Sequence, residues 1–338
     1  MKKTLLYLCL ACCVIIGTAL RMFGQNEKLA QTGMKFLSLS TDARGGALGD
    51  AMTSLEANSS AMFFNTATMA RMKNTADVAV NRTNWIAGIH YFSASAAFAP
   101  FNGDYGIIGV FFTSVDYGDD FYGTILAENE QGFEETGKLS PSAYAVGVGY
   151  ARALTDKFSI GGNVKLVGQN LGTSVIDIAD DGSRLDKDYK KSVLAFDFGL
   201  LYRTGYKSLV FGMCLRNFSQ EVKYEQESFQ LPLTFKVGVS MNIFDLTSID
   251  PGTHSLLLAV DAVQPRDYKQ QLSIGAEYGL MQKFFLRAGV LFPNDNYAFN
   301  AGVGFRQPVG GTVIGVDYAY TPFQKFDSVH RFSIHFGL

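Results

Sequence analysis

Cysteine is scarce in this chain of 338 residues, and its distribution excludes a fold held together by disulfides. Three of the four cysteines, Cys9, Cys12 and Cys13, fall within an apolar stretch at the N-terminus. If that stretch is a leader that is removed on export, only Cys214 remains, and a lone thiol cannot form an internal disulfide. We therefore expect Cys214 to be a small residue buried in a strand rather than a reactive thiol.

Long apolar runs are missing beyond the first residues. Two lysines precede an apolar stretch over 4–20 that has no acidic residue, and small and polar residues follow at Gly24 and Gln25. This order predicts a secretory signal peptide over residues 1–24 and an exported mature chain. No later run reaches the ~18 apolar residues that indicate a membrane-spanning helix.

Basic charge is not in excess, because Lys and Arg total 29 against 31 Asp and Glu, a net charge of −2 at pH 7. Loss of the predicted leader would remove Lys2, Lys3 and Arg21 and make the mature chain more acidic. Nucleic-acid-binding domains carry a basic surplus, so we expect no nucleic-acid partner. With only 8 prolines, and with 47% hydrophobic and 13% aromatic residues, the composition favours strands.

From about residue 76 onward the apolar residues recur with period two, which predicts β-strands. In the stretch over 191–202, for example, Leu194, Phe196 and Phe198 share one face, while small or polar residues share the other. The pattern predicts an even number of strands, about fourteen. We expect them near residues 76–83, 87–99, 104–117, 141–153, 157–171, 190–203, 208–219, 232–243, 254–264, 270–279, 283–292, 296–306, 310–320 and 328–338.

Connections of two kinds alternate between these strands. Tight turns such as "LTDK" and "TGYK" follow even-numbered strands, and long polar loops at 118–140, 172–189 and 220–231 follow odd-numbered ones. Together with strands of about ten residues, this arrangement is typical of outer-membrane barrels. A soluble β-sandwich also alternates, but its outward face would be more uniformly charged. The expected fold is all-β: a closed antiparallel transmembrane β-barrel of about 14 strands over 76–338.

Isolated charges interrupt the small-residue face of the predicted strands, and this face would line the lumen. These charges could form a polar path or a ligand site, or they could pair with one another and with a plug. Because unpaired charges away from water are costly, we favour pairing. The lumen-facing charges that we single out are Lys165, Asp197, Lys236, Glu277, Arg287 and Asp317.

Residues 25–75 lie between the predicted leader and the predicted barrel, and within them the stretch over 43–65 is rich in Gly, Ala and Ser. Their glycines lack the spacing of a phosphate-binding loop. Small residues would let this backbone pack inside a lumen that is itself lined by small residues, so we expect an N-terminal lumen plug. Arg44, Asp50 and Asn65 are its candidate site residues.

We also expect the charges of the plug to pair with charges of the wall. Arg44, Asp50 and Glu56 would then bond with inward charges such as Asp317 or Arg287.

No catalytic or metal-binding motif accompanies this pattern. The four histidines, His90, His254, His330 and His335, lie in no H-E-x-x-H motif and beside no carboxylate at triad-like spacing. Triads assemble in space, so spacing alone does not decide the matter, but it makes an outer-membrane hydrolase the weakest hypothesis. We expect no catalytic residue, no metal and no cofactor.

Several stretches of the sequence carry a family resemblance. They are "TGMKFLSLSTDARGGALGDAM", "ANSSAMFFNTATMARM", "NWIAGIHY", "FTSVDYGD", "YARALTDKFSIGGNVKLVGQNLG", "DFGLLYRTG" and "RNFSQ". From about Thr32 to Arg216, and more loosely beyond, the chain resembles the PorV/PorQ family. The usual Asn-Pro-Ala motif of that family stands here as Asn65-Thr66-Ala67, which puts the local turn geometry in question.

The resemblance implies a barrel like that of the long-chain fatty acid transporter FadL, with fourteen strands and an N-terminal segment folded into the lumen. It also implies an outer-membrane location and a role like that of PorV, which binds the C-terminal signal of cargo in type IX secretion. The expected function is thus non-enzymatic, with outer-membrane lipid, the secretion translocon and cargo C-terminal domains as partners. The alternative is a FadL-like transporter of hydrophobic small molecules.

Overall fold

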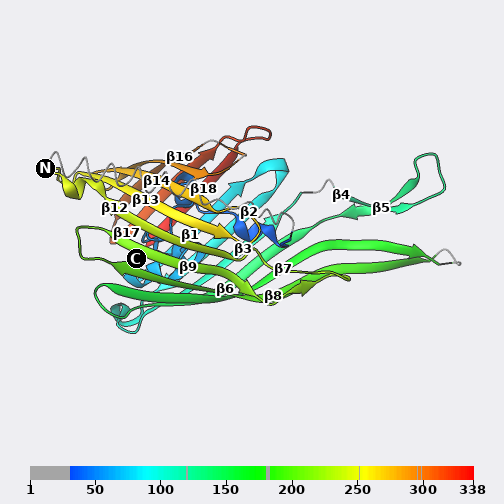
Figure 1. Ribbon diagram of the computed structural model, residues 1–338, viewed down its shortest axis with the longest axis horizontal. Helices are drawn as coiled ribbons and strands as arrows, with labels where there is room; N and C mark the ends of the chain where they lie inside the picture. The colour runs from blue at the N-terminus through cyan, green and yellow to red at the C-terminus, as the bar shows by residue number, and fades with distance from the viewer. Residues whose placement is uncertain (1–30, 119–120, 180–182, 251, 295, 298) are drawn as a thin grey trace.

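The computed structural model describes residues 31–338 apart from 119–120, 180–182, 251, 295 and 298, and its strands form a closed barrel (Figure 1). The predicted leader over 1–24 lies outside the described residues. Strands β1 and β18 pair antiparallel, with Ala79 opposite His335, and this pairing closes the ring.

Fourteen strands make up the barrel, each antiparallel to its neighbours, which confirms the predicted fold class. In chain order they are β1 (Ala76–Asn84), β2 (His90–Phe98), β3 (Ile107–Asp116), β6 (Ser142–Ala153), β7 (Phe158–Ile178), β8 (Arg184–Arg203), β9 (Val210–Ser219), β12 (Thr234–Asn242), β13 (His254–Pro265), β14 (Gln271–Leu280), β15 (Phe284–Phe292), β16 (Asn300–Val309), β17 (Thr312–Thr321) and β18 (Val329–Gly337). Each of them overlaps one predicted strand.

Strands β7 and β8 are much longer than predicted, at 21 and 20 residues. Most of the segment expected to be a loop over 172–189 therefore belongs to these two strands. The polar sequence suggested a loop, but β-branched residues such as Val175 and Ile178 favour extended backbone. Cross-strand pairs such as Val175 with Asp186 continue the ladder past a register shift.

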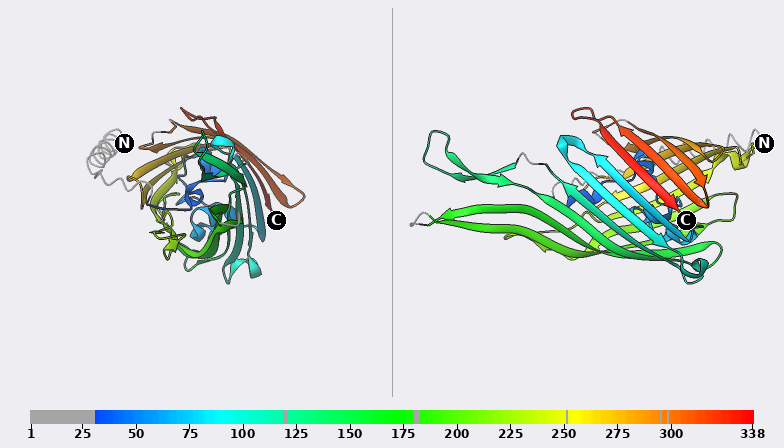
Figure 2. Two further views of the ribbon diagram at one scale, coloured as in Figure 1. Left: turned by 90° about the vertical axis from the view of Figure 1, so that its right-hand side faces the viewer. Right: turned by 180° about the vertical axis from the view of Figure 1, so that it is seen from behind.

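A second hairpin occupies the connection expected to be a loop over 118–140. It consists of β4 (Phe121–Leu126) and β5 (Phe133–Leu139), and Arg184 Nη1 joins it to β8 by donating to the Thr136 carbonyl oxygen at 3.1 Å. Both hairpins project well beyond the barrel at one end (Figures 1 and 2). We call this projection the arm; it comprises residues 121–126, 133–139, 171–178 and 184–190.

The remaining elements are short and lie in connections. They are the two-stranded sheet of β10 (Val222–Lys223) with β11 (Ser228–Phe229), and the 3₁₀ turns η4 (Ile86–Gly88), η5 (Pro100–Gly103) and η6 (Ile243–Leu246).

The barrel wall has two chemically different faces. In β6, Ala143 and Ala145 are buried toward the lumen, whereas the outward-facing Val146 and Val148 are 44% and 53% exposed. An outward belt of apolar side chains is the surface that a transmembrane barrel presents to lipid. No described helix is both long enough and apolar enough to cross a membrane.

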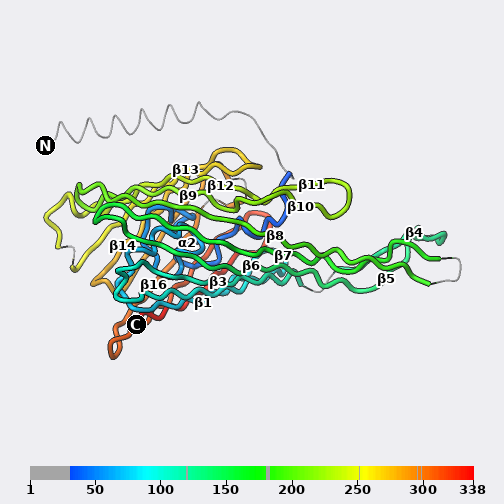
Figure 3. Tube along the Cα trace, turned by 90° about the horizontal axis from the view of Figure 1, so that it is seen from below, coloured from blue at the N-terminus to red at the C-terminus, as the bar shows by residue number. Residues whose placement is uncertain are grey.

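Residues 31–75 fold inside the barrel, where Figure 2 (left) shows them enclosed by the strands. We call this segment the plug. Its helices are short: η1 (Lys35–Ser38), α2 (Ala43–Ala47), η2 (Asn58–Phe63) and η3 (Thr66–Arg71). Figure 3 shows α2 among the strands when the barrel is seen from below.

The hydrophobic core lies in the lumen, between the plug and the wall. Met62 and Met69 of the plug pack over Gly109 of β3, and Phe63 meets Phe111 edge to face with ring centroids 5.6 Å apart. Unbranched methionines adapt to irregular gaps, which suits a helix seated on a curved wall.

We predict that Val148→Arg destabilises the barrel by about 2–4 kcal/mol, because it places a charge on the lipid-facing side of a mid-barrel strand. The measurement is reversible denaturant unfolding in lipid vesicles. Ile178→Arg, on the arm, is the matched control and should leave the free energy of unfolding nearly unchanged. Equal effects of the two substitutions would contradict the assignment of the lipid belt.

Candidate functional site

Charged groups join the plug to the wall on one side of the lumen. Arg44 of α2 donates to Glu277 of β14 through Nε and Nη2, both at 2.9 Å, and its Nη1 donates to the Glu56 carbonyl oxygen at 2.9 Å. The bidentate geometry gives this contact direction as well as charge. Arg44 was expected to pair with an inward wall charge such as Asp317 or Arg287; the structure places it on another of the predicted inward charges, Glu277.

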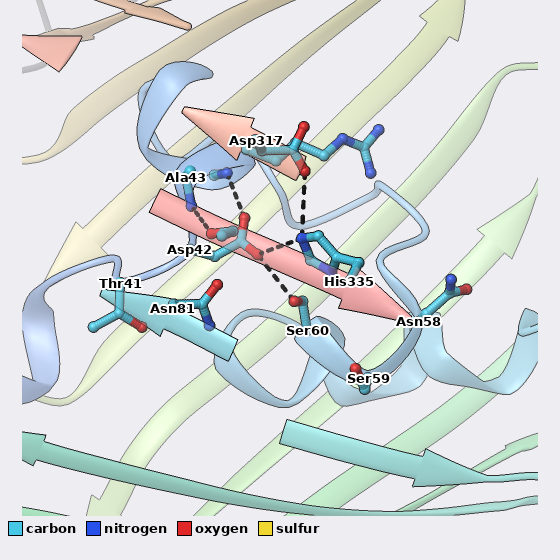
Figure 4. Close-up of polar contacts among 12 residues, drawn as sticks. Thr41, Asp42, Ala43, Asn58, Ser59, Ser60, Asn81, Asp317 and His335 are labelled. Atoms are coloured by element: carbon cyan, nitrogen blue, oxygen red, sulfur yellow. Dashed lines mark hydrogen bonds and ion pairs between the residues drawn. The ribbon is translucent and has the colours of Figure 1, made fainter. Parts of the chain in front are cut away.

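That chain continues through the wall and returns to the plug. Arg287 Nε lies 2.5 Å from Glu277 Oε2, and Arg287 Nη1 lies 2.5 Å from Asp317 Oδ1. The side chains of Arg287 and Asp317 are both 0% exposed. His335 Nε2 lies 3.3 Å from Asp317 Oδ2 and 3.8 Å from Asp42 Oδ2 (Figure 4).

The result is a closed circuit of ionisable groups that begins and ends on the plug. We call it the ion ring; its members are Asp42, Arg44, Glu277, Arg287, Asp317 and His335. Strands β14, β15, β17 and β18 each contribute one member. Since a buried charge is tolerated only when it is paired, the ring ties the plug to four strands at once.

Asp42 links the ring to other parts of the plug (Figure 4). As the N-cap of α2, its Oδ1 accepts from Gly45 N at 2.9 Å, and its Oδ2 accepts from Ser60 Oγ at 2.9 Å. The next residue, Ala43, donates its N–H to Ser333 Oγ of β18 at 2.8 Å. Asp42 thus joins α2 to η2 beside the wall.

A second polar cluster involves Lys165 and Asp197, which face the lumen from β7 and β8. Lys165 Nζ donates to Asp197 Oδ1 and Oδ2 at 2.8 and 2.7 Å and to Asn217 Oδ1 at 2.7 Å. Asn217 has a φ of 62° where the β8–β9 register shifts, and its N–H donates to Asp197 Oδ1 at 2.7 Å. The bulge therefore completes the hydrogen bonds of a buried carboxylate.

Asn65 anchors the far end of the plug. Its Oδ1 accepts from Ala67 N at 3.1 Å as the cap of η3, and its Nδ2 donates to the carbonyl oxygens of Thr53 and Leu200 at 2.7 and 3.0 Å. Thr66 is the first residue of η3. Proline is favoured at a first helical position because the N–H that it lacks would have no partner within the helix. Here the hydroxyl of Thr66 accepts from Asn163 Nδ2 at 3.0 Å, a contact that proline could not make.

Two of the predicted site residues remain outside these networks. Asp50, expected to bond with Asp317 or Arg287, makes no ion pair within the described part of the chain, and its Oδ1 is buried without a partner there. Lys236 likewise has no hydrogen bond or ion pair to any described residue. Glu56, expected at the same wall charges, pairs instead with Arg203.

The plug separates two cavities that share none of their described lining residues. One, of about 800 Å³, lies among the long loops, where Trp85, Tyr117 and Asn294 line it; we call it the loop-side chamber. The other, of about 630 Å³, lies among the tight turns, where Gln282 and Pro308 line it. The nine predicted site residues fall into three settings. Asn65 anchors the plug, and Asp50 and Lys236 line the loop-side chamber. The other six lie in bonded networks: Arg44, Lys165, Asp197, Glu277, Arg287 and Asp317.

Asp267, in the connection between β13 and β14, holds the start of the plug at the mouth of the loop-side chamber. It accepts from Thr32 Oγ1 and from Lys35 Nζ, the latter at 2.6 Å. Burial alone would favour the protonated acid, but these two donors outweigh it and lower the pKa of the Asp267 carboxyl below its ordinary value.

Sequence reasoning missed Asp42 and His335 as site residues. For each residue, a feature of the sequence could have indicated its place in the lumen. Asp42 precedes a short Gly- and Ala-rich stretch as a helix N-cap would. His335 alternates with the outward residues Ile334 and Phe336, which places it on the lumen face. Within the described residues, no cluster of three or more His, Cys, Asp and Glu side chains could hold a metal ion.

This architecture defines the protein as an outer-membrane β-barrel with a FadL-like fold. It is similar to the toluene transporter TbuX of Ralstonia pickettii, with 16% identity, a TM-score of 0.59, and coverage of 87% of this chain and 97% of that one. The toluene transporter TodX of Pseudomonas putida is 12% identical, with a TM-score of 0.57 and coverage of 92% of this chain and 98% of that one. A FadL homologue of Pseudomonas aeruginosa is 11% identical, with a TM-score of 0.55 and coverage of 88% of this chain and 98% of that one. At these identities the likeness shows the fold alone.

The family is shown by the sequence of residues 118–336, which matches the type IX secretion system membrane protein family PorP/SprF. The chain belongs to this family, in agreement with the predicted connection to type IX secretion. No curated protein matches the chain.

We predict that Glu277→Gln costs about 3–5 kcal/mol in the free energy of unfolding, because it leaves Arg44 buried without its carboxylate. Glu56→Gln is the matched control. It breaks the pair of Glu56 with Arg203, whose side chains are 37% and 40% exposed, and should cost at most about 1 kcal/mol. Denaturant unfolding measures both, and a Glu277→Gln cost no larger than that of the control would argue against a structural role for the ion ring.

A second prediction concerns the close approach of the plug to the wall at Gly289. A Cβ there would overlap the backbone of Leu48 and Gly49, so Gly289→Ala should destabilise the folded protein by about 1–3 kcal/mol. At Gly315 a Cβ would meet its nearest atom, Arg306 Cγ, at 3.5 Å, so Gly315→Ala should change stability by less than about 1 kcal/mol. The thermal midpoint of the folded form on heat-modifiability gels compares them; equal midpoints would contradict the tight seating of α2.

Proposed function

We propose that this barrel is a plugged, non-enzymatic component of type IX secretion that binds exported cargo or translocon partners at its loop-side end. Residues 1–24 would be removed as a leader, and residues 25–75 and 76–338 would act as plug and barrel. The observation that carries the proposal is the ion ring, which fills the lumen with bonds between plug and wall. Membership of the PorP/SprF family supports the assignment to secretion.

The use of lumen charges supports a filled barrel rather than a polar path. A barrel of fourteen strands is wide enough to enclose a cavity or a channel. Here Lys165, Asp197, Glu277, Arg287 and Asp317 all bond to other protein groups. Charges that are paired within the protein contribute to its stability and are not available to guide a passing solute.

The contacts of His335 support a non-enzymatic role. A hydrolytic triad needs a hydroxyl that donates to the imidazole, which is in turn oriented by a carboxylate. Ser60 Oγ donates to Asp42 instead, and His335 lies between two carboxylates (Figure 4). The cluster is organised as an electrostatic contact between plug and wall.

The arm supplies the surface for partners. It extends beyond the barrel end and exposes large apolar side chains away from the lipid belt, among them Leu126 at 91% exposure, Phe121, Ile178 and Leu185. Exposed apolar patches outside the membrane commonly mark protein interaction sites. Both hairpins also leave strand edges unpaired within the described residues, which can accept a partner strand.

A second candidate function is uptake of hydrophobic small molecules across the outer membrane. The specific observation in its favour is the loop-side chamber, which lies above the plug in a fold shared with two toluene transporters. It would require the plug to move or to leave a path, against the bonds of the ion ring.

To test the proposal, the barrel is tagged between Gly310 and Gly311, on the tight-turn side, crosslinked in intact cells and purified from solubilised outer membrane. Mass spectrometry should identify secretion components or exported cargo. Recovery of lipid alone, with no protein partner, would contradict the proposal and favour the transporter.

A shortened arm locates the contact. Replacing residues 172–189 with an Asn-Gly turn should abolish recovery of the partners, since that turn closes a hairpin without the projection. The same Asn-Gly replacement of residues 244–253, on the opposite end, is the matched control and should leave recovery intact. Unchanged recovery with the shortened arm would exclude the β7–β8 hairpin of the arm as the docking surface.

A further inference from the structure

The loop-side chamber contains two cations that the rest of the fold does not use. Lys236 of β12 and Arg216 of β9 both line it. Thr234 pairs with Arg216 across the two strands, and Lys236 pairs with Cys214, so the two cations are diagonal neighbours on one patch of wall. Diagonal neighbours in a sheet lie about 7–8 Å apart, within reach of a single bound group.

Neither cation is satisfied by the described part of the protein. Lys236 is only 9% exposed, yet it makes no hydrogen bond or ion pair with a described residue. Arg216 Nε is buried without a partner there as well. By contrast, the buried cations Arg44, Arg287 and Lys165 bond to carboxylates, and Arg331 donates to the Ser40 carbonyl oxygen and to Thr321 Oγ1.

Nearby carboxylates do not supply a hydrogen-bonded partner for either cation. Asp197 lies within electrostatic range of Arg216, but both of its oxygens already accept hydrogen bonds from Lys165. Asp261 lies within range of Lys236 and accepts from Thr53 N at 2.9 Å through Oδ2. Lys165, Arg216 and Lys236 therefore face only Asp197 and Asp261, which leaves one positive charge in excess beside an open cavity. The other charges of the chamber lining balance one another, since Lys35 pairs with Asp267 and Arg331 lies within electrostatic range of Asp50.

The remainder of the chamber suits an apolar group. Phe36 and Leu37 of the plug form part of its lining, and Trp85 and Ile89 contribute to it from the loop between β1 and β2. A volume of about 800 Å³ lies within the usual range of about 300–1,000 Å³ for small-molecule sites. Such sites combine apolar walls with a few polar groups that orient the ligand.

We propose that Arg216 and Lys236 form an anion-binding site in the loop-side chamber, which takes a carboxylate or phosphate carried on an apolar body. Desolvated cations with hydrogen bonds to spare bind an anion strongly, since the charge-assisted bonds replace those lost on burial. The site goes beyond the proposed function, because it holds whether or not the barrel serves secretion.

Trp85 provides a direct signal, since it is the only tryptophan in the sequence and it lines the chamber. The full barrel in lipid nanodiscs is titrated with phenyl phosphate, 4-phenylbutyrate, the neutral analogue 4-phenylbutanol, and inorganic phosphate, while tryptophan fluorescence is followed. The two aromatic anions should change the fluorescence saturably and bind at least tenfold more tightly than the alcohol. The tighter of the two identifies phosphate or carboxylate as the preferred group, and inorganic phosphate shows whether the apolar body adds affinity.

Variants then assign the binding to the two cations. Arg216→Gln with Lys236→Gln should weaken both aromatic anions at least tenfold and leave the weak alcohol signal unchanged. Lys283→Gln removes a cation from the opposite cavity and should bind like the unmodified protein. Heat-modifiability gels confirm that each variant is folded, and Lys236→Met alone gives a second variant with an apolar replacement of similar length.

Equal affinity for the alcohol and the anions would overturn the proposal. So would anion binding that a folded Arg216→Gln, Lys236→Gln double variant retains in full.

Discussion

The structure depends on one constraint: a charge buried in the lumen of this wide barrel is costly unless it finds a partner there. Arg287 and Asp317 are fully buried on the wall, and neither could remain charged in isolation. The plug resolves this by contributing Arg44 and Asp42, which close the ion ring. The charge pattern of the wall and the position of the plug are thus two aspects of one arrangement.

Glycine and methionine solve the complementary steric problem. Inward glycines of the wall allow the plug backbone to approach closely, as Gly212 does at Thr53 and Gly289 at Leu48. On the other side of the lumen, Met62 and Met69 fill the space above Gly109 and Gly149. The plug is therefore held by the ion ring against β14, β15, β17 and β18 and by apolar packing against β3 and β6, and these contacts together fix its orientation.

The wall could be predicted from sequence to a large extent because alternation is a local property. The position of Leu194 and Asp197 in the alternating pattern is enough to place them on opposite faces of the wall. The same alternation predicts all fourteen barrel strands. The arm could not be predicted in this way, because its polar residues do not alternate with apolar ones. Its strands are recognised only from cross-strand pairs such as Val175 with Asp186. Ion-pair partners were also out of reach: the lumen location of Arg44 was expected, but its choice of Glu277 over Asp317 depends on how α2 is seated. Asp50 and Lys236 were expected to pair, but neither forms an ion pair with a residue that the structure describes, and both line the loop-side chamber.

The central claim is that the plug closes the lumen through bonds with the wall, and single-channel conductance in planar bilayers tests it most directly. The intact chain should show no steady conductance, and removal of residues 26–75 should produce large, stable channels from a barrel that still folds, as judged by heat modifiability. An intact chain that conducts as well as the deletion variant, or a folded deletion variant that stays closed, would contradict the account.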